Sequence, residues 1–300
     1  MATNSITNES PEAWHVLICG LALDGDYFEL GEGITIRRLP NALSVFDLAA
    51  AGAVGFREWA VLEPLVSTAN AEIVSPLSVV KTPGYDALNK CWLVSALLVI
   101  RGYAKHFCPA VSAYSWTLVA GRSQQQDEDL PKFNGSLLDY HLSILVPAQM
   151  KDQPLSYGEA QWISRHLCQF NQLAASHERF RFALEASVDW RYAKDPRAAI
   201  SRLWAGIESL FGISTELVFR LSLFGSSELA PRGPERLAAF KRIKVAYGVR
   251  SKAVHGEPIA TDKLVAGMNN AFDILRSLIL NCVIRGSVPT EDDLYRELLC

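Results

Sequence analysis

Hydrophobic and polar positions alternate in short runs through the first half of the chain. Two such runs, Trp14 to Leu23 and Tyr27 to Leu39, lie on either side of a short acidic stretch that contains a glycine. Alternation between turn residues predicts two strands joined by a tight turn. Thr117 to Ala120 and Tyr140 to Val146 are further strand candidates. The leucine-rich run Ala87 to Tyr103 predicts a helix that packs on the sheet.

The second half of the chain follows a different pattern. Beyond Ser156, apolar residues recur every three or four positions, which is the spacing of helices with one buried face. The polar segment Lys151 to Pro154 separates the two patterns and favours a boundary there. We therefore expect an α+β protein, with an N-terminal mixed, strand-rich domain at residues 1–152 and an all-α helical bundle at residues 153–300.

One helix of this bundle carries charged residues near its end. It should stop at Gly256, because glycine is favoured just beyond a helix and Pro258 cannot continue the turn. Arg250 lies on its apolar stripe, roughly 40° from the centre, and His255 lies roughly 100° away on the other side. We expect His255 to bend back at the helix end toward the groove of Arg250. The stripe consists of Phe240, Ile243, Tyr247, Arg250 and Val254.

The spacing Arg250-x4-His255 resembles the signature of the HEPN superfamily, compact helical domains in which an Arg-x4-6-His motif ends a helix. Residues 250–256 resemble its ApeA-type branch. Two further segments appear in the family's order, Leu203 to Phe211 and Phe219 to Leu223, and a long apolar helix follows the motif. Many active members carry Asn or Asp after the motif arginine, whereas this chain has Ser251, which is usual in the ApeA-type branch.

The resemblance implies metal-free cleavage of RNA. A histidine can accept the 2′-OH proton or donate one to the leaving oxygen, while a guanidinium stabilises charge on the phosphorane. One histidine cannot be base and acid at once, so the resemblance implies a homodimer through the helical domain, whose cleft holds two Arg and two His. Glu208 would orient Arg250 through a charge-assisted bond, with Tyr247, Ser251 and Lys252 in support. An ion pair of Arg250 with Glu208 that is only structural is the alternative.

A basic segment leads into the motif. Between residues 232 and 252, seven basic residues face Glu235 alone, a local charge of +6 in a chain of −3. This resembles an electrostatic footprint for phosphate, with Lys241, Arg242 and Lys244 as RNA contacts; a solvated helix face is the alternative. Gly248 costs about 1 kcal/mol relative to alanine inside a helix. Close approach of another helix or a ligand, or crowding within the monomer, would explain it.

Composition narrows the remaining possibilities. With 49% hydrophobic and 20% charged residues, the 300-residue chain is typical of soluble globular proteins. Its six cysteines form no C-x-x-C pair, so we expect buried thiols in a reducing cytoplasm, no metal site and no cofactor. The start lacks a signal peptide and Cys91 to Ile100 is too short to span a bilayer, so no membrane partner is expected. The pair His106 and Cys108 fits the end of a packed helix.

The sequence thus favours a metal-independent HEPN-type endoribonuclease of a defence or toxin system. Its partners would be RNA and a second copy of the chain, with a regulatory partner or trigger at the N-terminal domain, which carries no catalytic motif of its own. Two alternatives stay open. One is a non-catalytic protein that binds nucleic acid or nucleotides in the same basic cleft, and the other is a scaffold that only dimerises.

Overall fold

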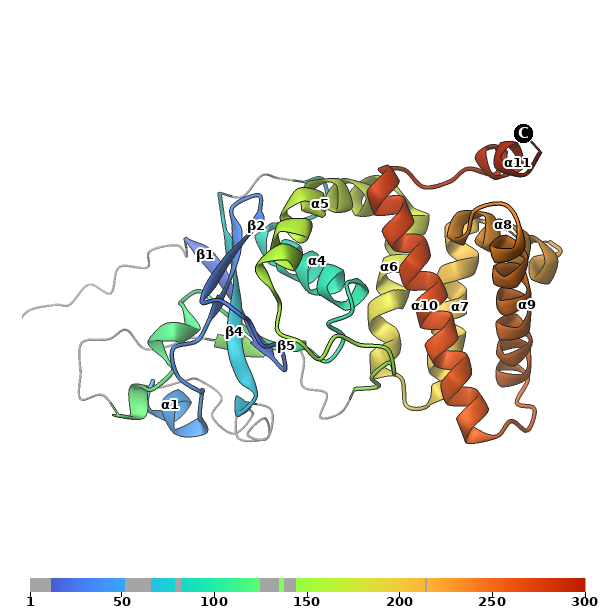
Figure 1. Ribbon diagram of the computed structural model, residues 1–300. Coiled ribbons are helices and arrows are strands. Elements are labelled where there is room, and N and C mark those ends of the chain that lie inside the picture. The colour runs from blue at the N-terminus through green and yellow to red at the C-terminus, as the bar shows by residue number, and fades with distance from the viewer. Residues whose placement is uncertain are drawn as a thin grey trace, which may run out of the picture.

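A computed structural model describes residues 12–51, 66–78, 82–124, 135–137, 144–213 and 215–299. The described strands lie in the N-terminal part and form a sheet, and a helical region follows it along the chain (Figure 1). The prediction of an α+β protein is therefore confirmed. The arrangement places the helix that carries Arg250 and His255 far from the sheet (Figure 1).

The sheet has six antiparallel strands in the order β2-β3-β4-β1-β5-β6. The first strand of the chain lies inside it, between β4 and β5, because its last four residues are all buried and apolar and need cover on both faces. The strands are β1 (Ala13–Cys19), β2 (Tyr27–Gly31), β3 (Ile34–Arg38), β4 (Ala69–Pro76), β5 (Phe107–Ser112) and β6 (Gly135–Leu137).

The run from residue 27 to residue 39 is a hairpin of two strands and not the single strand that its alternation predicted. Its turn passes through Gly31 and Gly33, with φ of 93° and 76°, and Glu32 between them has φ of 53°. The Glu32 carboxylate accepts hydrogen bonds from Lys90 at 2.5 Å and from Asn171 at 2.9 Å. These bonds hold a non-glycine residue in the left-handed region and fasten the hairpin to the helices behind it.

One predicted strand is wrong. Residues 116–118 form a 3₁₀ turn, because the buried Glu72 carboxylate accepts the backbone N–H of Trp116 at 2.8 Å and Ser115 accepts that of Thr117 at 3.0 Å. The candidate strand Tyr140 to Val146 lies partly outside the described residues, and residues 144–146 belong to no strand. The pattern also missed β4 and β5, which supply the two partners of β1.

The helices follow the predicted pattern more closely. Asp195 caps α7 by accepting the N–H groups of Arg197 and Ala198, and Pro196 takes the first helical position. Helix α8 begins at Leu217 and continues through Gly225 to Leu229. The helices are α1 (Val45–Ala50), α4 (Ala87–Ile100), α5 (Tyr157–Ser176), α6 (Glu178–Asp189), α7 (Pro196–Phe211), α8 (Leu217–Leu229), α9 (Pro234–Val254), α10 (Thr261–Arg285) and α11 (Glu291–Leu299).

The predicted boundary at residue 152 stays a prediction, and the buried apolar core is continuous across it. Leu23 forms a parallel bridge with Leu155, and α5 packs against β2. Arg101 at the end of α4 pairs with Glu159 of α5 at 2.8 Å. Helices α4 and α5 lie between the sheet and helices α6 to α10 (Figure 1).

Candidate functional site

Helix α9 ends where the sequence predicts. Val254 is its last residue, and Gly256 follows with φ of 71°. Arg197 of α7 holds this end from outside the helix, because it donates to the carbonyl of Ala253 at 3.2 Å and to that of Glu257, just beyond the helix, at 2.7 Å. The start of α7 therefore fixes the position of the motif-bearing end of α9.

Arg250 lies in a groove between α9 and α7, as its place on the apolar stripe predicts. Its Nη2 lies 3.0 Å from Oε1 of Glu208, and its guanidinium carbon is 5.3 Å from the centre of the Tyr247 ring. The edge of Trp204 meets the same ring at 5.1 Å between centres. The expected pairing of Glu208 with Arg250 is thus present, although half-buried side chains on both sides leave the groove open to solvent.

Several polar atoms in this groove are buried without a hydrogen-bond partner among the described residues. Nε of Arg250 and Nε1 of Trp204 are two of them, and the Trp204 side chain is fully buried. Unpaired buried polar atoms are uncommon, and a cluster of them favours a bound water or ligand. Burial raises the pKa of Glu208, and the nearby Arg250 charge opposes that rise without cancelling it. The ionised form of Glu208 is therefore less favourable here than it is in water, even with Arg250 beside it.

His255 does not bend back toward Arg250, contrary to our expectation. His255 is the residue that directly follows α9; its N–H still donates to the Ser251 carbonyl at 3.1 Å, and its side chain is exposed. Five residues of helix separate the two side chains by about 140° around the axis and about 7.5 Å along it. No hydrogen bond or ion pair joins them in the described part of the chain. One chain therefore presents an arginine and a histidine on two different sides of α9.

His255 instead shares a side of α9 with lysines. At about 100° per residue, five exposed positions fall within an arc of about 80°. We call this surface the lysine face; its members are Lys241, Lys244, Gly248, Lys252 and His255. Arg242, the third predicted RNA contact, points about 100° away from Lys241, toward α10, where its charge opposes the burial-driven rise in the pKa of Asp273.

The basic segment is less positive than its sequence indicates. Arg236 pairs with Glu297 at 2.8 Å, and Arg250 pairs with Glu208. Counting these two carboxylates with Glu235 leaves a local charge of +4. The exposed lysines of the lysine face carry most of what remains.

Gly248 is not explained by crowding within the monomer. A Cβ built on it meets no described atom within 4 Å. The exposed apolar residues Leu237 and Val245, at 55% and 71% exposure, lie on the same side of α9, a feature that our sequence reasoning missed. The helical period alone places Leu237 and Val245 away from the buried stripe of α9, so their exposure could have been predicted from the sequence. Because Gly248 has no side chain and no described neighbour, the backbone of a partner or a ligand can approach α9 closely on this side.

The N-terminal part has a cavity of about 350 Å³ between the sheet, α4 and the end of α6, lined in part by Cys91, Cys108 and Arg191. Burial raises the pKa of the Cys91 thiol, so the thiol is not activated. His106 nearby is fully buried and bonds Ser95 at 2.8 Å; burial, with the Arg191 charge, lowers its pKa to about 3. The His106 and Cys108 pair therefore fits the structural role that we expected.

Neither metal ligands nor membrane spans emerge from the described residues. They contain no group of three or more His, Cys, Asp or Glu side chains arranged to hold a metal ion. None of the helices in the described ranges has both the length and the apolar character needed to cross a bilayer. Comparison of the chain with protein-family models, with curated proteins and with solved structures gave no match.

Proposed function

We propose that this protein is a metal-independent endoribonuclease of the HEPN type that acts as a homodimer. The observation that carries the proposal is the position of His255, which is exposed at the end of α9 and aligned with Lys241, Lys244 and Lys252. A row of lysines attracts a phosphate backbone. A histidine at the end of that row is placed to move a proton at a phosphate that the lysines hold, since an imidazole ring can both accept and donate a proton.

Arg250 is assigned to charge stabilisation. A guanidinium is always charged and its planar fork matches the oxygens of a phosphorane. Glu208 restrains this fork through the 3.0 Å ion pair, and the Arg250 side chain stays 23% exposed, which leaves part of the guanidinium accessible to a phosphate oxygen. Glu208 is therefore a positioning residue in this proposal, and Ser251 lies on the turn between Arg250 and His255.

The dimer follows from the divergence of the two motif side chains. Within one chain they leave α9 about 140° apart, which is a poor arrangement for acting on one phosphodiester. A second copy that meets the open end of α9, where Val254 is 46% exposed, would bring the arginine of one protomer toward the histidine of the other. The N-terminal domain is proposed to sense the trigger, which agrees with its lack of a catalytic motif.

Complementation between variants tests the shared site. Arg250→Ala and His255→Ala should each abolish RNA cleavage, and Arg250→Lys should restore little, because an ammonium cannot form two parallel bonds. Mixed after reversible dissociation, the two inactive alanine variants should regain part of the activity through heterodimers. Mixtures that stay inactive although heterodimers form would exclude a site that works with one arginine from one protomer and one histidine from the other. RNA binding without cleavage by any form would leave a non-catalytic RNA-binding protein.

A further inference from the structure

The C-terminal helix α11 is attached to the rest of the protein by charge more than by apolar packing. Only Leu294 of this helix is buried, and the ring of Tyr295 packs on the edge of Phe224 at 5.4 Å between centres. Figure 1 shows α11 at the end of an extended connection from α10, beside α8. A helix that buries so little apolar surface is expected to open at low free energy.

Acidic residues of α11 bind arginines of the neighbouring helices. Glu291 pairs with Arg220 of α8, and Glu297 pairs with Arg236 of α9 at 2.8 Å. Arg232, just before α9, donates to the backbone carbonyl of Glu297 at 2.6 Å. The nearby arginine lowers the pKa of the Glu297 carboxyl, which keeps it ionised. With four carboxylates and one arginine, α11 carries a formal charge of −3.

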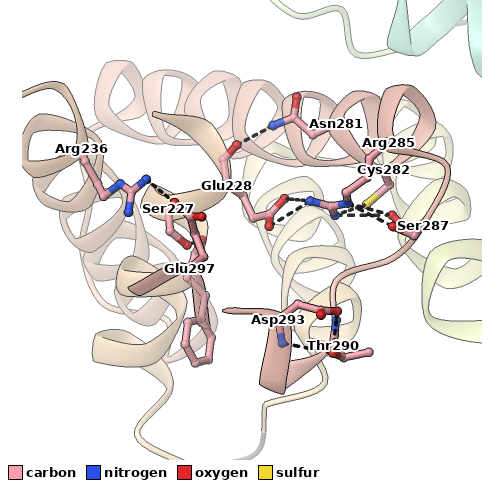
Figure 2. Close-up of polar contacts among 11 residues, drawn as sticks. Ser227, Glu228, Arg236, Asn281, Cys282, Arg285, Ser287, Thr290, Asp293 and Glu297 are labelled. Atoms are coloured by element: carbon pink, nitrogen blue, oxygen red, sulfur yellow. Dashed lines mark hydrogen bonds and ion pairs between the residues drawn. The ribbon is translucent and has the colours of Figure 1, made fainter. Parts of the chain in front are cut away.

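The space beneath α11 is polar. Figure 2 shows the charged side chains that surround a cavity of about 450 Å³ between α11 and the ends of α8 and α10. Glu228 on its wall pairs with Arg285 at 2.9 Å and accepts from Asn281 through its carbonyl at 2.6 Å. These groups satisfy one another without α11, so separation of α11 would leave few of them unpaired.

One of the covered arginines, Arg236, lies on the basic helix α9, about 120° around the axis from the centre of the lysine face. Arg236 precedes Lys241 and Lys244 on α9 by one to two turns, and the Arg236 and Arg220 side chains are only 14% and 16% exposed beneath α11. A guanidinium binds carboxylate and phosphate oxygens with the same fork. The carboxylates of Glu291 and Glu297 thus occupy positions that phosphates of a polyanion can take.

We propose that Arg220, Arg232 and Arg236 form a phosphate-binding surface at the start of α9, on a different side of that helix from the lysine face, and that α11 covers it until RNA displaces the helix. The acidic helix then acts as an intramolecular competitor of RNA. This inference rests on the proposed function only in naming RNA as the polyanion. It does not require that the RNA is cleaved.

The experiment compares two double variants of the full chain in a His255→Ala background, with a short oligouridylate as probe. Glu291→Gln with Glu297→Gln removes both carboxylates that pair with arginines. Asp292→Asn with Glu235→Gln makes the same charge change at exposed residues. The first pair should bind the oligouridylate more tightly than the control pair. Each arginine that becomes free should steepen the slope of log K against log salt by about 0.7.

A further measurement follows the helix itself. Amide hydrogen exchange of residues 291–299 should accelerate when the oligouridylate binds the His255→Ala protein, and Arg220→Gln with Arg236→Gln should remove the gain in affinity of the Glu-to-Gln pair. Equal affinities in the two double variants, or unchanged exchange in α11 at saturating RNA, would overturn the inference. If this inference fails but the wild-type chain cleaves RNA, the proposed function still stands. If the wild-type chain does not cleave RNA, the competition between α11 and RNA for the arginines is not affected.

Discussion

Replacement of Gly248 by alanine should change stability and RNA binding in opposite directions. Glycine in a helix interior is less stable than alanine by about 1 kcal/mol, because the unfolded chain has more freedom at glycine. Gly248 is exposed and a Cβ there meets no described atom within 4 Å, so the full gain should appear. In a chain of this size, about 1 kcal/mol raises Tm by roughly 2 °C.

If the phosphate backbone of RNA passes close to α9 between Lys244 and Lys252, the added methyl group of Gly248→Ala should weaken RNA binding although the fold is more stable. Thermal unfolding and titration with a short oligouridylate measure the two effects on the same samples. Gly158→Ala on α5 is the matched control, since Gly158 is also exposed in a helix and has only Ser156 Oγ nearby, at 3.9 Å. A Gly248→Ala protein that is stabilised and binds RNA as the wild type does would refute close approach at this position.

Three further predictions concern charge and assembly. Lys241→Gln with Lys244→Gln should weaken RNA binding and reduce the slope of log K against log salt by about 1.4. Arg242→Gln, on a different side of α9, should change this slope much less. Burial raises the pKa of Glu208 in the folded protein, so the wild type should lose stability as pH rises through that pKa. Glu208→Gln cannot ionise, so its free energy of unfolding should rise relative to that of the wild type over the same pH range in denaturant titrations. A lower stability of the variant at neutral pH would mean that its bond to Arg250 is mainly structural. Light scattering at micromolar concentration should give a dimer, and a monomer with and without RNA would contradict the shared site.

The sequence predicted the helical half better than the sheet. Helices α7 and α9 have long apolar stripes, and local signals such as Asp195-Pro196 and Gly256 fix their ends. Strand partners depend instead on residues distant in the chain. β1 pairs with β4 and β5, and the buried Glu72 carboxylate redirects residues 116–118 into a turn. No local pattern carries that information.

The sequence predicted which residues belong to the candidate site better than it predicted how they lie relative to one another. The period of α9 placed Arg250 on its buried side, and the pairing with Glu208, which is present at 3.0 Å, was implied by the family resemblance. The bend expected at His255 did not occur, because the backbone hydrogen bond to Ser251 keeps the helix regular. Glu297 neutralises Arg236 of the basic segment only because α11 packs beside α9. The sequence of the basic segment alone does not predict this contact.

The central claim is most directly tested by RNA cleavage with wild type and His255→Ala side by side in EDTA. His177→Ala is the control, because His177 is an exposed histidine at the end of another helix. The wild type and the control should release products with 2′,3′-cyclic phosphate ends, since the nucleophile is the substrate's own hydroxyl and no metal activates water. His255→Ala should be folded, dimeric and inactive. Cleavage that persists in His255→Ala, or that requires Mg²⁺, would contradict the account.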